Sequence, residues 1–445
     1  MRRDAINSRF IICVLILLPM LVPCDVYAQG ITTRVSVSSA GVQGNGASYN
    51  PSISSDGRFV TFDSDADNLV AGDTNGAVDP YSGVDIFVHD RQTGQTTRVS
   101  VSSAGVQGNG ACYGPSISSD GRFVAFESDA DNLVDGDTNG DVFPYSGTDI
   151  FVHDRQTGQT TRVSVSSAGV QGDRPSSSPK ISSWGRYAAF DSYADNLVAG
   201  DTSGDDDPNS TADVFVHDRQ TVQTTRVSVS STGAQGNERS KYPSISSDGR
   251  FVAFRSEADN LVDGDTNNAN DIFIHDRQTA QTTRVSVSSA GMQGNSASYN
   301  PSISSDGRIV AFESEADNLV DGDTNGDVNS YRSTDIFIHD RQTVQTSRVS
   351  VSSAGIQANG ISFSPSISSD GRFVAFDSDA DNLVVGDSNN SVDVFVHERL
   401  LPDLCECDFD GDGDVDGKDL DTQTAGETGI ALESFALKFG KLDCS

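Results

Sequence analysis

The sequence predicts an all-β fold, a six-bladed β-propeller closed by its N-terminal strand and followed by a small α-helical module. Three observations lead to this prediction. A unit of about 64 residues recurs six times, each unit carries two hairpin signals, and its apolar residues form the continuous runs of strands that are covered on both faces.

The repeat can be followed through one arginine, which precedes Val-Ser-Val-Ser-Ser in every copy. Successive copies are 64, 64, 64, 58 and 64 residues apart, at Arg34, Arg98, Arg162, Arg226, Arg284 and Arg348. A fixed period indicates a repeat architecture. We assign the repeat region to residues 32–400.

Each unit contains four candidate strands, which the first unit illustrates. Residues 51–54 and 58–64 flank a Ser-Asp-Gly turn, and residues 85–90 and 96–103 flank a second turn. Asp-Gly between apolar runs is a strong hairpin signal. Four antiparallel strands in succession therefore predict one small sheet per unit.

The apolar patterns rank these strands by burial. Phe-Val-Ala-Phe and Ile-Phe-Val are continuous, whereas Arg-Val-Ser-Val-Ser-Ser alternates as a half-exposed outer strand does. A four-stranded sheet that is covered on both faces and repeated six times predicts the radial stack of blades of a propeller.

The two ends of the repeat region complement each other. The region begins with an outer-strand sequence at residues 32–39 and ends with a third-strand sequence at residues 393–400, so the sixth unit lacks its own outer strand. We expect residues 32–39 to join the blade made by residues 365–398, which would leave no open edge between the first and last blades.

Residues 1–28 have the organisation of a secretory signal peptide. Basic residues precede the apolar segment 10–22, and Val26-Tyr27-Ala28 provides a small-residue cleavage site. A lipoprotein signal ending at Cys24 is the alternative interpretation, although Pro23 stands where that signal needs a small residue. Either interpretation takes the protein out of the cytoplasm, and no later segment has the roughly 18 apolar residues of a membrane span.

The charge and the cysteines are both typical of a protein that works outside the cytoplasm. A net charge of −34 disfavours nucleic acid and anionic membranes and favours cations, calcium above all. In an oxidising compartment Cys444 has two candidate partners, Cys405 and Cys407, while Cys112 stays unpaired.

The histidines and serines do not indicate catalysis. All six histidines occupy the same slot of the repeat, at His89, His153, His217, His275, His339 and His397. A catalytic residue should break the symmetry of a ring, so we expect a structural role. The sequence also lacks a Gly-x-Ser-x-Gly elbow. We therefore predict that the protein is not an enzyme.

Two regions are candidates for calcium. In the blades, Asp73, Asn75 and Asp85 place oxygen side chains in a glycine-punctuated loop, which suits either a hard cation or an ordinary turn. Near the C-terminus a twelve-residue loop has the EF-hand pattern, with Gly413 at the sixth position. Its predicted calcium ligands are Asp408, Asp410, Asp412, Asp414, Asp416 and Asp419.

Two resemblances add to these expectations. The unit Pro-Ser-Ile-Ser-Ser-Asp-Gly-Arg-Phe-Val-Ala-Phe, followed by Asp-Ile-Phe-Val-His-Asp, resembles the TolB-like propeller repeat over residues 32–400. That resemblance implies the fold, and it implies a binding platform or a non-catalytic propeller. Residues 405–445 resemble a dockerin module with one legible calcium loop, which implies a small calcium-folded attachment module.

Together these observations predict a secreted, monomeric, non-catalytic protein that binds or scaffolds an extracellular or envelope protein or a polysaccharide. Nucleic acid and membrane insertion are excluded as partners by the charge and by the hydropathy of the chain. The alternative is a lyase or hydrolase that acts on polysaccharide above the propeller channel. Such an enzyme would need an asymmetric cluster, and the visible asymmetries are Cys112, Trp184, Tyr193, and the pair Arg239 and Lys241.

Overall fold

The computed structural model of the protein describes residues 33–74, 83–138, 147–201, 211–324, 334–388 and 391–399. Over these ranges the chain forms six antiparallel sheets and no helix. The chain divides into two units, Met1–Arg34 and Val35–Ser445, and all six sheets belong to the second. The helical module predicted for residues 405–445 and the leader at residues 1–28 lie outside the described residues.

The strands are short and nearly identical from one sheet to the next. The first three sheets consist of β1 (Ser48–Ile53), β2 (Phe59–Ser64), β3 (Asp85–Asp90) and β4 (Gln95–Arg98); β5 (Cys112–Ile117), β6 (Phe123–Ser128), β7 (Asp149–Asp154) and β8 (Gln159–Arg162); and β9 (Ser176–Ile181), β10 (Tyr187–Ser192), β11 (Asp213–Asp218) and β12 (Gln223–Arg226). The last three consist of β13 (Ser240–Ile245), β14 (Phe251–Ser256), β15 (Asp271–Asp276) and β16 (Gln281–Arg284); β17 (Ser298–Ile303), β18 (Ile309–Ser314), β19 (Asp335–Asp340) and β20 (Gln345–Arg348); and β21 (Ser362–Ile367), β22 (Phe373–Ser378) and β23 (Asp393–Glu398).

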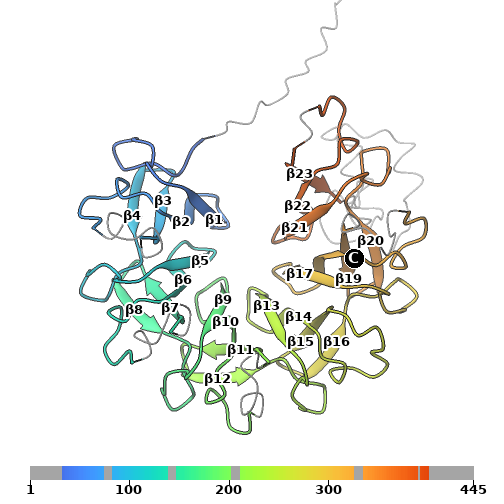
Figure 1. Ribbon diagram of the computed structural model, residues 1–445, viewed down its shortest axis with the longest axis horizontal. Helices are drawn as coiled ribbons and strands as arrows, with labels where there is room; N and C mark the ends of the chain where they lie inside the picture. The colour runs from blue at the N-terminus through green and yellow to red at the C-terminus, as the bar shows by residue number, and fades with distance from the viewer. Residues whose placement is uncertain are drawn as a thin grey trace, which may run out of the picture. The chain divides into compact units, whose positions relative to one another are not determined.

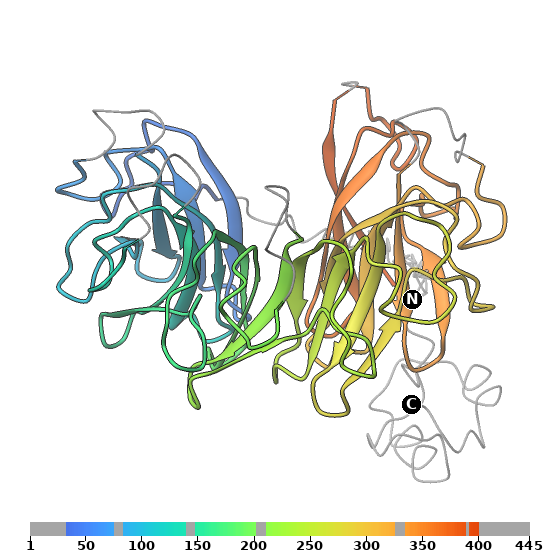
Figure 2. The ribbon, with the colours of Figure 1, turned by 60° about the horizontal axis from the view of Figure 1, so that its bottom comes forward.

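Within each sheet the strands are ordered as they occur in the chain. The first sheet runs β1-β2-β3-β4, and the last runs β21-β22-β23. Figure 1 shows the sheets following one another in chain order, with the first strand of each sheet on the inner side and the fourth on the outer side. Figure 2 shows the hairpin loops that join the strands at both ends of the sheets. The predicted all-β six-bladed propeller is confirmed by this topology.

The hydrophobic core lies between consecutive sheets. Ile86 and Val88 of β3 are fully buried and pack in one cluster with Val124 and Phe126 of β6, and equivalent clusters join the later sheets. The continuous apolar runs therefore arise because each of these strands has a neighbouring sheet on either face.

The outer strand differs from its prediction. We expected residues 96–103 to form one half-exposed strand, but β4 ends at Arg98, and Val99 is 2% exposed. Beyond Val99 the chain crosses to the second sheet, where Thr160 donates a hydrogen bond to the Val101 carbonyl and Ser103 donates one to the Thr160 carbonyl at 3.3 Å. The alternating pattern thus reflects a segment that joins two sheets.

The start of the repeat region makes the same crossing contact with the first sheet. Thr96 donates a hydrogen bond to the Val37 carbonyl, and Ser39 donates one to the Thr96 carbonyl at 3.3 Å. In the described part of the chain the sixth sheet has three strands, and β23 pairs with β22 alone. The predicted pairing of residues 32–39 with the last sheet is therefore wrong for residues 37–39.

The first and last sheets each present an apolar face to solvent. Val394 and Val396 of β23 are 74% and 64% exposed, whereas the equivalent Ile86 and Val88 are fully buried. On the first sheet Ile53 is 56% exposed, whereas the equivalent Ile117 is 7% exposed. These are the two faces that every interior sheet buries against its neighbours.

Candidate functional site

The predicted calcium loop lies outside the described residues, together with its ligands Asp408, Asp410, Asp412, Asp414, Asp416 and Asp419. The same holds for Cys405, Cys407 and Cys444. Cys112 is described and is a buried free thiol. Its Sγ lies 3.1 Å from Ser128 Oγ, and burial raises the pKa of this thiol, so it remains protonated at neutral pH.

The acidic residues of the blade loops are held by protein groups. Arg98 Nη1 lies 3.2 Å from Asp73 Oδ1 and 3.3 Å from Asp85 Oδ2. Gln107 Nε2 donates hydrogen bonds to the same two oxygens at 2.9 and 2.8 Å. Burial raises the pKa of Asp85 to about 6, although Ser100, Arg98 and Gln107 counteract this rise. Asn75, the third proposed ligand, lies outside the described residues.

The compressed fourth loop shows the complete set of oxygen side chains. Arg284 Nη1 lies 3.3 Å from Asp265 and 3.5 Å from Asp271, and the Asn267 amide donates to Asp271 at 3.3 Å. Across the described ranges no three His, Cys, Asp or Glu side chains are grouped as a metal site requires. The contacts of Asp265 and Asp271 with Arg284 and Asn267 support the ordinary-turn alternative for this loop.

The histidine slot is structural in the five four-stranded sheets. His89 Nδ1 lies 2.9 Å from Thr96 Oγ1, and the other four pairs are 2.8–2.9 Å apart. Burial lowers the pKa of these histidines, to about 4 for His217, so the rings are neutral at physiological pH. Each ring therefore joins the third and fourth strands of its own sheet.

A row of acidic residues on the second strands links neighbouring sheets near the inner side. Asp63, Glu127, Asp191 and Glu313 each accept a hydrogen bond from a main-chain N–H of the next sheet, at 2.8–3.2 Å. Burial raises the pKa of Glu127 to about 7 and also raises the pKa values of Asp191 and Glu313. These carboxyl groups hold the inner strands together.

The fourth sheet breaks this row with a positive charge. Arg255 stands at the corresponding position of β14 and pairs directly across the sheet with Lys241 of β13. The other five cross-strand pairs each combine a carboxylate with an uncharged residue: Tyr49 with Asp63, Tyr113 with Glu127, Ser177 with Asp191, Tyr299 with Glu313, and Phe363 with Asp377. Like charges directly opposite each other destabilise a sheet.

Three tyrosines surround these two cations. The Arg255 guanidinium carbon lies 4.6 Å from the ring centroid of Tyr242 and 5.5 Å from that of Tyr299. Lys241 Nζ lies 4.3 Å from the ring centroid of Tyr193 and within hydrogen-bond distance of its hydroxyl. Tyr242 is 43% exposed. The result is an accessible cluster of cations and aromatic rings, which we call the inner sector: Tyr193, Lys241, Tyr242, Arg255 and Tyr299.

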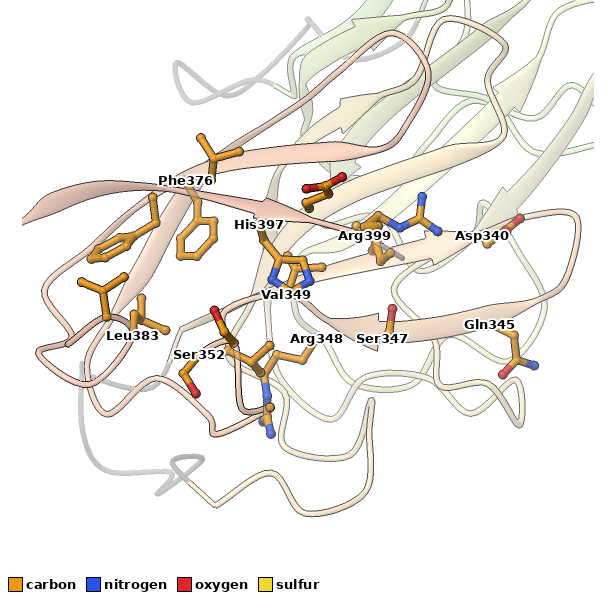
Figure 3. A pocket seen from close by; sticks show the side chains of 18 of the residues that line it. Asp340, Gln345, Ser347, Arg348, Val349, Ser352, Phe376, Leu383, His397 and Arg399 are labelled. Carbon is orange, nitrogen blue, oxygen red and sulfur yellow. The ribbon is translucent and has the colours of Figure 1, made fainter. Parts of the chain in front are cut away.

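A second feature is a groove of about 820 Å³ on the outer side of the sixth sheet, lined by residues of the fifth and sixth sheets (Figure 3). Figure 3 shows His397, Phe376 and Ser352 gathered around this space. In the other five sheets the corresponding space holds the fourth strand and its threonine, such as Thr96 beside His89. The groove is therefore the position of a fourth strand.

Sequence reasoning found part of the inner sector. It noted Tyr193, Lys241 and Arg239 as asymmetric, and the structure brings the first two together. It missed Arg255, although a comparison of the second strands shows Asp or Glu in five copies and arginine in the fourth. The structure places Arg239 beside Glu257 at 3.2 Å, and Trp184 in an exposed turn.

Comparisons with known proteins concern the fold. No family model matches the chain, and no curated protein matches it. Among solved structures, TolB from Acinetobacter baumannii is 16% identical with a TM-score of 0.37, covering 68% of this chain and 53% of its own. A putative TolB from Agrobacterium tumefaciens is 14% identical with a TM-score of 0.42, covering 80% and 92%. An oligogalacturonate lyase in complex with manganese is 12% identical with a TM-score of 0.44, covering 80% and 77%.

All three TM-scores lie below 0.5, so nothing in these names is transferred to this chain. The chain spans about half the length of the first of these proteins. Over the described ranges, no helix has the length and apolar character of a membrane span.

Proposed function

We propose that the protein is a secreted, non-catalytic propeller that binds an extracellular or envelope ligand, with a calcium-binding module at its C-terminus. The observation that carries this proposal is the inner sector, because it is accessible and departs from an otherwise regular repeat. Asp191 and Glu313 lie beside this cluster, but each carboxyl group accepts a main-chain hydrogen bond from the next sheet. The exposed cations and aromatic rings therefore suit recognition better than chemistry. The signal-like residues 1–28 support secretion.

The propeller would be rigid if its first and sixth sheets were joined. The groove in Figure 3 supports such a junction, because it leaves room for a fourth strand on the sixth sheet. Residues Ile31–Arg34 correspond in the repeat to Gln95–Arg98, which form β4. In that register Arg34 would reach Asp393, as Arg98 does with Asp85 in the first sheet. Because residues 37–39 already contact the first sheet, the same segment would join the sixth sheet to the first.

We expect calcium to bind in the loop at residues 408–419. Carboxylates at alternate positions with a glycine at the sixth position are the pattern that a hard cation requires. An attachment module folded by calcium would hold the propeller on a surface or an assembly while the inner sector stays accessible.

One observation favours an enzyme as the second candidate. Lys241 Nζ contacts the Tyr193 hydroxyl, and a lysine beside a tyrosine is an arrangement that general acid–base catalysis also uses. A polysaccharide lyase or hydrolase would then act at the inner sector. Release of reducing ends or of unsaturated products from polysaccharides, abolished in Tyr193→Phe, would establish this function in place of binding.

The proposed function can be tested by capture on the full-length mature protein. Envelope and culture extracts would be passed over immobilised parent protein, over the double variant Lys241→Tyr/Arg255→Glu, and over Tyr49→Ser as a matched inner-strand control. We expect one defined protein or glycan to be retained by the parent and the control and lost by the double variant. Equal retention by all three would show that the inner sector is not the binding site.

A further inference from the structure

Among the described residues, the positive side chains that break the repeat lie in the third and fourth sheets. In the described ranges arginines recur in the slots of Arg58 and Arg91 in all six sheets, and in the slot of Arg98 in the five four-stranded sheets. The cations outside those slots are Arg174, Lys180, Arg239, Lys241 and Arg255. All five lie on or beside β9, β13 and β14. Duplication of the unit does not account for this grouping, because it would distribute such residues over all six sheets.

Lys241 and Arg255 form the centre of this group. They are direct cross-strand partners, and both side chains are partly exposed. Each cation has a neighbouring carboxyl group, Asp191 for Lys241 and Glu313 for Arg255, and burial raises the pKa of both carboxyl groups. An anion that contacts both cations would relieve the repulsion that remains between them. A carboxylate accepts hydrogen bonds from an ammonium and a guanidinium at once.

The tyrosines of the inner sector indicate the chemistry of the rest of the ligand. Tyr242 and Tyr299 both face the Arg255 guanidinium, and Tyr242 leaves 43% of its surface open to solvent. An aromatic ring with a hydroxyl offers a flat apolar face together with a hydrogen-bond donor. A sugar ring, with one face of C–H groups and a rim of hydroxyls, has matching chemistry.

We propose that the inner sector binds a short acidic saccharide, with its carboxylate between Lys241 and Arg255 and its ring against Tyr242. This proposal rests on the binding function proposed above and names the class of ligand. A short ligand is favoured because a chain with a net charge of −34 repels a long polyanion. An acidic peptide matches less well, since extended peptides gain affinity from main-chain pairing and side-chain pockets.

The test uses two ligand series that differ only in the carboxylate. Calorimetry on the full-length protein would compare β-1,4-linked glucuronate oligomers of two to four residues with glucose oligomers of the same linkage and length. We expect the glucuronate series to bind at least tenfold more tightly. Arg255→Glu and Lys241→Tyr restore residues that other copies of the repeat carry, so both variants should fold, and a cooperative thermal transition would confirm this.

The variants decide the outcome. The proposal predicts that each loses at least tenfold in glucuronate affinity, while Tyr49→Ser on the first sheet binds as the parent does. Equal binding of the glucose series, unchanged affinity in Arg255→Glu, or tighter binding of a glutamate tetrapeptide would each overturn it. If glucuronate fails while capture of a partner still depends on Lys241 and Arg255, the binding function stands and only the ligand class is wrong.

Discussion

Arg155 of the second sheet stacks on Phe59 of the first, with its guanidinium carbon 4.4 Å from the ring centroid. Arg58 lies over the same ring at 4.6 Å. The arrangement recurs at the next three junctions, where Phe123, Tyr187 and Phe251 each contact one arginine of their own sheet and one of the following sheet. The repeat assigns Arg91 of the first sheet to Phe373 of the sixth.

The first prediction compares Arg155 with Arg91, which occupy the same slot of the repeat. Arg155 stacks on a ring of the preceding sheet, whereas the ring that the repeat assigns to Arg91 belongs to the sixth sheet. Arg155→Ala should lower the free energy of unfolding by about 1–2 kcal/mol, because it removes a partly desolvated cation–π contact. If the sixth and first sheets meet in solution, Arg91→Ala should have the same effect within a factor of two. Both arginines also donate to a glycine carbonyl of the Asp-Gly turn, so this contribution cancels in the comparison.

Denaturant unfolding at neutral pH would measure both variants. A cost for Arg91→Ala less than half of that for Arg155→Ala would show that the end faces do not meet in solution.

A second prediction fixes the register of the missing strand. In the first sheet Val88 pairs with Thr97, so the same register would place Val396 opposite Thr33. Thr33→Cys with Val396→Cys should form a disulfide under mild oxidation, because directly opposed Cβ atoms in antiparallel strands lie about 4.5–5.5 Å apart.

Thr33→Cys with Val394→Cys is the matched control, displaced by two residues along β23. Disulfide formation can be followed by mass spectrometry after thiol alkylation. Efficient closure of the control pair, or failure of the first pair, would contradict the register.

The sequence predicts the sheets well because their signals are local. Asp-Gly turns, apolar runs and the 64-residue period together locate β1–β3 in the first unit to within a few residues. The conformation of residues 99–103 was harder to predict. Apolar residues at every second position are equally consistent with a half-exposed strand and with a segment that crosses to the next sheet. Only the position of the next sheet, where Thr160 contacts Val101, distinguishes these alternatives.

Only part of the inner sector could be predicted from the sequence, because the meaning of its residues depends on contacts between distant segments. A single substitution such as Arg255 has no local signature, and its meaning comes from the cation that stands opposite it across the sheet. Likewise, the acidic residues of the blade loops have the spacing of cation ligands. Only the fold shows that the carboxylates of Asp73 and Asp85 are bound by Arg98 and Gln107. Local spacing cannot show which distant residue arrives at a carboxylate.

A third prediction concerns these loops and the C-terminal calcium loop. Calorimetry with Ca²⁺ on the full-length protein should detect about one ion, since a twelve-residue loop of this type holds a single Ca²⁺. Asp412→Asn should weaken this binding at least tenfold. Asp265→Asn should leave the number of ions unchanged, because Arg284 and Gln293 already hold Asp265.

The binding of several ions, reduced in number by Asp265→Asn, would instead show that calcium displaces the arginine in the blade loops. The melting temperature measured with and without EDTA would distinguish the two results, because ions bound only to the native state raise it.

A fourth prediction uses Glu127, which accepts a hydrogen bond from the Ser178 N–H at 2.9 Å. Burial raises the pKa of Glu127 to about 7, with further rises from nearby carboxylates and an opposing effect of Ser178. The charged groups that face it are Asp63, Asp129, Asp191 and Lys180. In the unfolded chain a glutamate titrates near roughly 4.3, so between these two pH values the folded protein holds the extra proton. The free energy of unfolding must therefore fall as the pH rises through this window.

Glu127→Gln removes this dependence and keeps an oxygen that accepts the Ser178 N–H. We expect the variant to be as stable as the parent at pH 5 and more stable at pH 8, by up to about 3 kcal/mol. Other groups with shifted pKa values are common to both proteins and cancel in the difference. Denaturant titrations at several pH values would measure it, with the exposed Glu238→Gln as the control. A difference between variant and parent that does not change from pH 5 to pH 8 would show that Glu127 is already ionised at the lower pH, and that the junction between the second and third sheets tolerates the charge.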